Sequence, residues 1–262
     1  MFFTKASVNW SYIALFYSKL KNGAWSAPQA VKFTGQYRDC DPFVSADGQY
    51  LYFSSDRPVP GKPFKDYAYK LYRVKLKGAE VVSEPILVNL PIPDSAIANH
   101  CTFTANGNIY FSMSADGDSE IYRCVYKNGN FLPPEKLGFN AKEFIDFDPM
   151  VASDENFVVF SSNNRKGIGS TDLWISRNTD GQWSAPINLG PQVNTPGADG
   201  SAGLSRDNKT LYFSSARETI APAEREKPAG TQKILQQLHS NKNGLRNIYQ
   251  IALEGLINPP PH

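Results

Sequence analysis

The sequence lacks the motifs by which most enzyme classes are first identified. It contains no Gly-x-Ser-x-Gly nucleophile elbow, no His-Glu-x-x-His zinc motif, no phosphate-binding loop and no dinucleotide fingerprint. Of its three histidines, His262 is the last residue and His239 lies in a variable segment, so only His100 belongs to the regular part of the chain. A serine hydrolase is therefore not expected.

Long apolar runs and an excess of one charge are also missing. The best apolar run, Ile13 to Tyr17, is far below the roughly 18 residues of a membrane span. Met1 is not followed by the basic and apolar segments of a signal peptide. The 27 Lys and Arg nearly balance the 25 Asp and Glu, which leaves a net charge of +2. We expect neither membrane insertion nor a nucleic-acid partner.

Cysteine is scarce, and the three that are present do not have the Cys-x-x-Cys spacing of metal or redox sites. We expect Cys40, Cys101 and Cys124 to be buried free thiols on strands. The alternative is a disulfide between Cys40 and Cys101, which lie near the starts of neighbouring inner strands.

What the chain does contain is a recurring hexapeptide. Tyr-Leu-Tyr-Phe-Ser-Ser at residues 50–55 returns in variant form at residues 108–113, 157–162 and 210–215, with a shortened copy at residues 1–4. The intervals between the shared phenylalanines are 50, 58, 49 and 53 residues. A period of about 50 residues built from short strands is typical of a β-propeller with one four-stranded sheet per repeat. The sequence thus predicts an all-β, five-bladed β-propeller of antiparallel blades. The aligned residues are Phe3, Phe53, Phe111, Phe160 and Phe213.

The fourth repeat gives the clearest plan of a blade. Asp148–Ser153 is predicted as the innermost strand, followed by strands at Phe157–Ser162, Asp172–Arg177 and Trp183–Leu189, with a tight turn at Asp180–Gly181. Proline recurs in the outer strand, as expected at a sheet edge, because proline cannot donate to a ladder. These prolines are Pro28, Pro85, Pro134 and Pro186.

We expect a single domain over residues 1–262. Its repeats span about residues 1–35, 36–94, 95–142, 143–195 and 196–256, with an insertion at 217–246 in the last blade. The first and last blades are predicted to be incomplete, because repeat one begins at its second strand and repeat five has no obvious outer strand. Since exposed strand edges are usually covered, we expect upstream sequence to complete the ring. The alternative is that Met1 is the true start and that the ring tolerates a gap.

Two stretches resemble a known repeat family. Asp41-Pro-Phe-Val-Ser-Ala-Asp-Gly48, followed by Leu51-Tyr-Phe-Ser-Ser-Asp-Arg57, resembles the WD40-like propeller repeat of TolB-type bacterial periplasmic proteins. The run from Trp183 to Thr195 is similar to a subgroup found in surface and periplasmic proteins of Gram-negative bacteria. The resemblance covers essentially the whole chain and implies the fold and a periplasmic or cell-envelope location. It leaves the function open, because such repeats serve unrelated tasks.

Strand alternation places the long connections on one face of the ring. The loops Asp56–Tyr69, Asn163–Thr171 and Arg217–Arg246 share this long-loop face with the connections between blades, whereas the opposite face carries short hairpins. Long loops in compact domains are usually functional or disordered. The long-loop face is therefore the predicted binding face. Its expected aromatic rim contacts are Trp10, Tyr37, Tyr67 and Tyr69.

Polar residues also recur in pairs where the inner strands begin. Members of a pair are two residues apart and are expected to share one side of the strand, so five carboxylates and a histidine would converge on the central channel. Such carboxylates need a positive partner, either arginine or a calcium ion held by Asp41 and Asp148. A structural role, accepting hydrogen bonds from loop amides, stays open. The predicted ligand-binding set is Asp39, Asp41, His100, Asp146, Asp148, Asp199, Arg57 and Arg165.

Two functions agree with these patterns. The first is a non-catalytic, monomeric binding propeller of the bacterial cell envelope that recognises a protein or surface glycan and requires no cofactor. The alternative is a glycoside hydrolase that uses Asp41, Asp148 and Asp199 around the central funnel. The inner strands offer no glutamate as the acid near their starts, which favours the first function.

The insertion at 217–246 is the least regular part of the chain. Thr231–Ser240 is predicted to form a short amphipathic helix with Thr231 as its cap and Ile234, Leu235 and Leu238 on one face. It would serve as a lid over the channel or as a partner surface. The alternative is a mobile excursion, which Pro222, Pro228 and the charged residues between them fit equally well.

Overall fold

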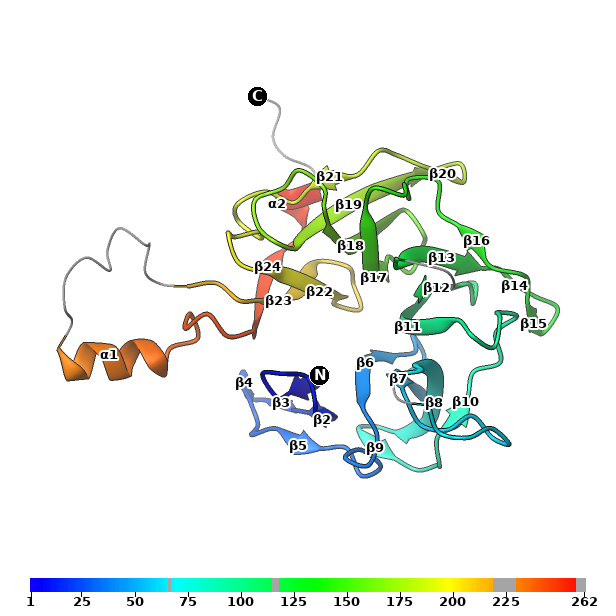
Figure 1. Cartoon of the computed structure of the whole chain (residues 1–262), viewed down its shortest axis with the longest axis horizontal. Coiled ribbons are helices and arrows are strands. Elements are labelled where there is room, and N and C mark those ends of the chain that lie inside the picture. Colours follow the sequence, from blue (N-terminus) through cyan, green and yellow to red (C-terminus); the bar gives the residue numbers. More distant parts are fainter. Residues whose placement is uncertain (66, 115–117, 219–229, 258–262) are drawn as a thin grey trace.

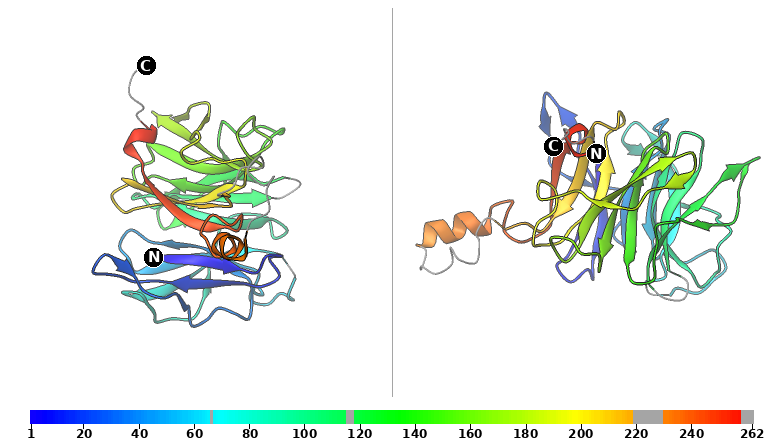
Figure 2. Two further views of the ribbon diagram at one scale, coloured as in Figure 1. Left: turned by 90° about the vertical axis from the view of Figure 1, so that its left-hand side faces the viewer. Right: turned by 90° about the horizontal axis from the view of Figure 1, so that it is seen from above.

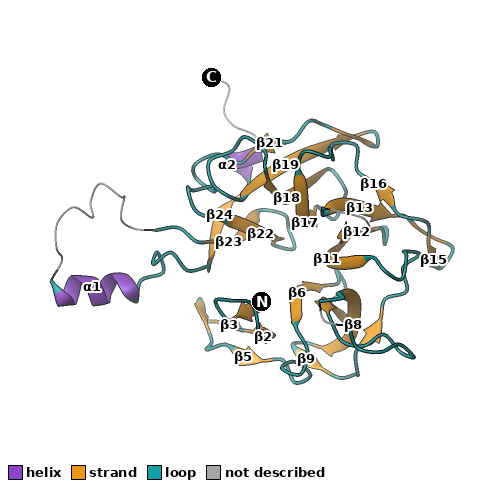
Figure 3. Ribbon diagram, viewed as in Figure 1, coloured by secondary structure: helices purple, strands orange, loops and turns teal. Residues whose placement is uncertain are grey.

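Five antiparallel sheets stand around a central axis like the blades of a propeller (Figure 1). The structure is a computed structural model that describes residues 1–65, 67–114, 118–218 and 230–257. Within each sheet the strands follow one another in sequence order from the inside outward. The predicted five-bladed, all-β propeller is confirmed, and strands make up nearly all of the regular structure (Figure 3).

The strands divide among the blades as the phenylalanine repeat predicts. Blade 1 holds β1 (Phe2–Ala6), β2 (Ile13–Tyr17), β3 (Leu20–Lys21), β4 (Ala24–Trp25) and β5 (Gln29–Ala30). Blade 2 holds β6 (Asp39–Val44), β7 (Tyr50–Ser55), β8 (Lys70–Lys77), β9 (Glu80–Val81) and β10 (Ile86–Leu87). Blade 3 holds β11 (Ile97–Phe103), β12 (Ile109–Ser114), β13 (Glu120–Cys124), β14 (Tyr126–Lys127), β15 (Asn130–Phe131) and β16 (Glu135–Lys136).

Blades 4 and 5 continue the ring. Blade 4 holds β17 (Ile145–Val151), β18 (Phe157–Asn163), β19 (Asp172–Thr179), β20 (Gln182–Trp183) and β21 (Ile187–Asn188). Blade 5 holds β22 (Asp199–Leu204), β23 (Thr210–Ser215) and β24 (Asn247–Ala252). Among the described residues, the main sheets of blades 1 and 5 have three strands each, in agreement with the prediction that both blades are incomplete.

The outer strand is not the continuous strand predicted from Trp183 to Leu189. It is split into β20 and β21, and the turn at Asp180–Gly181 that precedes it is confirmed by the positive φ of both residues. The strand is split partly because Pro186 has no N–H to donate to the neighbouring strand. In addition, the Arg177 amide donates to the Ser184 hydroxyl at 3.0 Å rather than to a backbone carbonyl of the outer strand. Ser83 and Ser26 accept the amides of Lys75 and Lys19 in the same way, at 2.8 and 3.0 Å.

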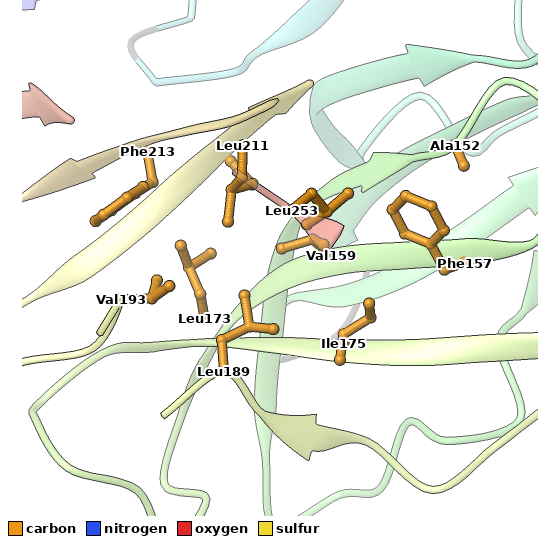
Figure 4. Packing of buried hydrophobic residues seen from close by; sticks show 11 residues of the cluster. Ala152, Phe157, Val159, Leu173, Ile175, Leu189, Val193, Leu211, Phe213 and Leu253 are labelled. Atoms are coloured by element: carbon orange, nitrogen blue, oxygen red, sulfur yellow. The ribbon is translucent and has the colours of Figure 1, made fainter. Parts of the chain in front are cut away.

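Hydrophobic residues are buried between blades. Four clusters fill the four interfaces from blade 1 to blade 5. In the cluster between blades 4 and 5, Val159 and Leu173 of blade 4 meet Leu211 and Phe213 of blade 5 (Figure 4). Each fully buried leucine or phenylalanine contributes about 1.5–3 kcal/mol of transfer free energy. The ring is thus held together blade against blade. Three free thiols are buried on its strands as predicted: Cys40, Cys101 and Cys124.

The insertion contains α1 (Thr231–Leu238), which projects from the edge of the ring on the side where blade 5 meets blade 1 (Figures 1 and 2). It does not lie over the channel, so the lid prediction is not supported. The amide of Ile234 bonds to the carbonyl of Gly230, which makes Gly230 rather than Thr231 the capping residue. The prolines and charges at 222–228 lie outside the described residues. A second short helix, α2 (Glu254–Ile257), follows β24. Among the described residues, no helix is long and apolar enough to cross a membrane.

Candidate functional site

Every inner strand contains a bulge at the second residue of the predicted polar pair. The pairing register of β6, β11, β17 and β22 shifts at this point. The residue at the shift has a positive φ of 47–54°: Asp41, His100, Asp148 and Ser201. Asp and His adopt this left-handed conformation more readily than most side chains, and a bulge re-aims a side chain relative to a regular strand.

The backbone amides of these bulge residues tie the blades together. The amide of Asp41 donates to the Thr4 hydroxyl at 3.1 Å, and the amide of His100 donates to Ser54 at 2.9 Å. The two remaining bonds run from Asp148 to Ser112 at 2.8 Å and from Ser201 to Ser161 at 3.1 Å. Each acceptor is the residue after the shared phenylalanine, on the second strand of the preceding blade. We call these four contacts the hydroxyl ring.

The side chains of the same residues form a cluster on the channel. His100 Nδ1 lies 3.3 Å from Asp148 Oδ1 and 3.7 Å from Asp41 Oδ1. The Ser201 hydroxyl donates to Asp148 Oδ2 at 3.0 Å. Burial alone would lower the pKa of His100, but the two carboxylates outweigh burial and raise this pKa to about 10. The imidazole is therefore an imidazolium at neutral pH. It supplies the positive charge that we expected near the converging carboxylates.

Asp41 shows the complementary effect. Burial alone would raise its pKa, but the neighbouring His100 imidazolium outweighs burial and lowers it. Asp41 is thus ionised and paired. Within the residues that the structure describes, no group of three or more His, Cys, Asp or Glu side chains is placed to hold a metal ion. Asp41 and Asp148, the predicted calcium ligands, both face the imidazole.

The first residue of each polar pair does not join this cluster, because the bulge separates the two members of the pair. Asp146 is almost fully buried and binds Arg165 through two contacts, Nε to Oδ1 at 3.0 Å and Nη2 to Oδ2 at 2.7 Å. Asp39 binds Arg57 at 2.7 Å, and Asp199 lies 3.7 Å from Arg217. These three Asp–Arg pairs are buried, and two of them contain the arginines of the predicted ligand-binding set, Arg57 and Arg165.

Aromatic rings complete each Asp–Arg pair. The Arg165 guanidinium lies over Phe144 at 4.1 Å and near Phe160 and Trp174, each at 5.8 Å. Arg57 and Arg217 lie in the same way over the shared Phe53 and Phe213, at 5.1 and 5.3 Å. Burial raises the pKa of Asp39, although Arg57 opposes that effect. A carboxylate and a guanidinium enclosed by aromatic rings form a structural clamp.

Exposed aromatic residues lie in the loop between β1 and β2 of blade 1 and in the loop between β7 and β8 of blade 2. Trp10 is 50% exposed and Tyr67 is 49% exposed, and both have a positive φ, 59° and 57°. The Arg38 guanidinium lies 4.0 Å from the centre of the Tyr67 ring and is held by the buried Asp56 at 2.8 Å. Tyr12 and Phe64 are more than half exposed in the same two loops. Bulky residues at positive φ are rare, and such strain is concentrated at functional sites.

Sequence reasoning found the cluster residues but missed its fourth member and its supports. Ser201 is not in the predicted ligand-binding set, and the hydroxyl ring was not foreseen. Its signal was present in the repeat, because Ser or Thr follows the shared phenylalanine in every copy. Of the predicted rim residues, Trp10 and Tyr67 are exposed, whereas Tyr37 and Tyr69 are partly buried.

Searches with family models and with curated sequences find no match to this chain. Solved structures with a similar fold include an α-L-arabinofuranosidase from Lactobacillus brevis, at 12% identity and a TM-score of 0.55, covering 96% of this chain and 86% of that one. Kuenenia stuttgartiensis hydrazine synthase matches at 14% identity and a TM-score of 0.51, covering 82% of this chain and 35% of that one. TolB from Acinetobacter baumannii matches at 15% identity and a TM-score of 0.48, covering 81% of this chain and 45% of that one. At such identities, the two matches with a TM-score above 0.5 show a shared fold and no more.

Proposed function

We propose that this chain is a non-catalytic binding propeller of a bacterial cell envelope, with the WD40-like repeats of TolB-type proteins, that recognises a surface glycan or an envelope protein through its long-loop face. The observation that carries the proposal is the group of exposed aromatic residues in the loops of blades 1 and 2. Trp10 and Tyr67 are half exposed on strained backbone, and exposed aromatic rings stack on sugars and anchor protein interfaces.

The loop of blade 1 supports this role because its own hydrogen bonds shape it. Asn9 Oδ1 accepts bonds from the Ser7 hydroxyl at 2.9 Å and from the Ser11 hydroxyl at 2.8 Å. The Trp10 amide donates to the Ser7 carbonyl at 2.9 Å, and the Ser7 amide donates to Tyr12 at 2.9 Å. A preorganised aromatic side chain loses little entropy on binding.

The channel cluster supports a non-catalytic role. A glycosidase needs two carboxyl groups that flank the sugar, one protonated and one ionised. Asp41 and Asp148 instead contact the same imidazole nitrogen, and the His100 ring lies between them. Asp199, the third carboxylate of the glycosidase hypothesis, is fully buried beside Arg217.

The test compares two double variants on one set of ligands. Fluorescently labelled protein is applied to an array of bacterial surface glycans and, in parallel, cross-linked to envelope proteins. We expect Trp10→Ala with Tyr67→Ala to lose the bound ligand, and Asp41→Asn with Asp148→Asn to retain it. The same proteins are assayed on aryl arabinofuranosides and xylosides. Turnover that disappears in the Asp double variant would establish the glycosidase and overturn the proposal.

Calcium in the channel is tested separately. An ion held by Asp41 and Asp148 would have to displace the His100 imidazolium. A rise in melting temperature with millimolar calcium that is lost in the Asp double variant would demonstrate such a site. A melting temperature that is the same with calcium and with chelator would exclude it.

A further inference from the structure

The junction of blade 5 with blade 1 differs from the other four positions around the ring. In blades 2 to 5 the inner strand packs against the second strand of the preceding blade: β6 on β1, β11 on β7, β17 on β12 and β22 on β18. Each of these junctions has its own hydrophobic cluster. Among the described residues, no such cluster joins blade 5 to blade 1, and none of the extensive contacts between strands does so. We call this junction the seam (Figure 1).

One side of the seam is the open edge of β1. The Leu15 amide donates to Thr34 and its carbonyl accepts the Val31 amide, so the backbone groups of Leu15 face β5. Leu15 is the partner of Thr4, so these two residues form a non-hydrogen-bonded antiparallel pair. In such a pair both residues direct their backbone N–H and C=O groups away from each other. Thr4, and by alternation Phe2 and Ala6, therefore present N–H and C=O groups along the inner edge of blade 1. Within the described part of the chain, no strand pairs with this edge.

The other side of the seam is an uncovered face of blade 5. Tyr52 and Tyr110, on the second strands of blades 2 and 3, are buried against the next blade. Tyr212 holds the same place on β23 but is only half-buried. Burial alternates along β23 and β24, whereas β7, β12 and β18 are buried on both faces. Among the described residues, β23 therefore lacks the cover that the inner strand of the following blade gives to every other second strand.

Ser214 lacks the backbone amide donor that its equivalents in the other blades receive. It follows the shared Phe213 and is the equivalent of Thr4, Ser54, Ser112 and Ser161, each of which accepts an inner-strand amide. Ser214 Oγ instead accepts from the exposed Arg246 Nη1 at 2.9 Å and donates to the Gly200 carbonyl at 3.1 Å. A guanidinium on a long side chain thus takes the place of the backbone amide.

We propose that the seam is a binding site for an extended peptide with the chemistry of an inner strand, which adds to β1 as the innermost strand of blade 1. The four existing inner strands define the chemistry of this peptide. It carries a residue that tolerates positive φ, whose amide replaces Arg246 on Ser214, and it carries apolar residues that cover Tyr212. Asp-Pro followed by two apolar residues, as in β6 and β17, has this character. Open strand edges bind such segments through backbone hydrogen bonds.

The probe is a fluorescein-labelled peptide with the sequence of residues 143–156, the inner strand of blade 4, titrated against the full chain by fluorescence anisotropy. We expect saturable one-to-one binding, and none with a scrambled peptide. Ala6→Pro removes an edge N–H without touching the bonds between β1 and β2, and should abolish binding, while Ala6→Ser should retain it. Ser214→Ala should weaken binding about five- to tenfold.

Three outcomes would overturn the proposal. These are no saturable binding, equal binding by Ala6→Pro, and equal binding of the scrambled peptide. Sedimentation identifies a competing occupant, because a dimer that Ala6→Pro dissociates would mean that a second copy of this chain fills the edge. Ser214→Ala provides an independent test if Ala6→Pro does not fold. The long-loop variant Trp10→Ala with Tyr67→Ala should bind the peptide normally, which separates this site from the proposed recognition face.

Discussion

At the residue scale, His100 is the group on which the charge balance of the channel depends. Its pKa is about 10 in the folded chain and 6.5 in the unfolded chain. Because folding raises this pKa, the stabilisation is complete below pH 6.5 and is lost as the pH rises through 10. His100→Gln should lower the free energy of unfolding by about 2–3 kcal/mol at pH 6, less than a fully buried pair would, because both carboxylates are partly exposed.

Urea unfolding of the wild type and His100→Gln between pH 6 and pH 10 measures this effect. Other groups titrate in this range in both proteins, so the informative quantity is the difference between the two. We expect that difference to shrink as the pH rises. A difference that stays constant over the whole range would show that His100 does not act through its charge.

The Asp–Arg clamps give a second prediction at this scale. Arg165→Met keeps most of the side-chain volume but leaves Asp146 as a buried charge without its partner. We expect a loss of about 3–5 kcal/mol in the free energy of unfolding. The matched control is Lys32→Met, which breaks the exposed Lys32–Glu80 pair at 3.4 Å and should cost less than about 1 kcal/mol. Similar costs for both variants in urea titrations would contradict the structural role of the clamp.

At the element scale, the hydroxyl ring connects each inner strand to its neighbour. Ser112→Ala leaves the amide of Asp148 in the interior without its acceptor, which should cost about 1–3 kcal/mol. Ser214→Ala is the matched control, because its hydroxyl meets an exposed arginine rather than a strand amide. We expect its cost to be only a few tenths of a kcal/mol. Thermal unfolding of both variants measures the contrast, and equal losses would mean that the ring bonds do not stabilise the blades.

The inner strands also show which features could be predicted from the sequence and which could not. The shared phenylalanines were enough to predict five blades and their order, because the repeat is one blade long. The geometry of the polar pairs was not predictable by strand alternation, because a bulge follows Asp39, Asp146 and Asp199 and re-aims the next polar side chain. An arginine four or five residues after the shared phenylalanine was visible in three repeats and marks the clamps: Arg57, Arg165 and Arg217.

At the scale of the whole molecule, the ring behaves as a row of blades rather than a closed circle. Among the residues that the structure describes, blades 2, 3 and 4 have a hydrophobic cluster on both sides, whereas blades 1 and 5 each have one. In proteins built from repeats, stability is the sum of the repeats and of the interfaces between neighbours. The blades at the two sides of the seam should therefore open locally at a lower free energy than the middle blades.

Native-state hydrogen exchange tests this expectation blade by blade. The amides shared by β18 and β19 should exchange most slowly, and those between β1 and β2 and between β23 and β24 should exchange faster by at least an order of magnitude. Binding of the peptide of residues 143–156 should slow exchange in β1 and β23 together, because one inserted strand would contact both. Uniform protection around the free ring would mean that the seam is closed in solution, and that blade 5 and blade 1 stabilise each other as the other neighbours do.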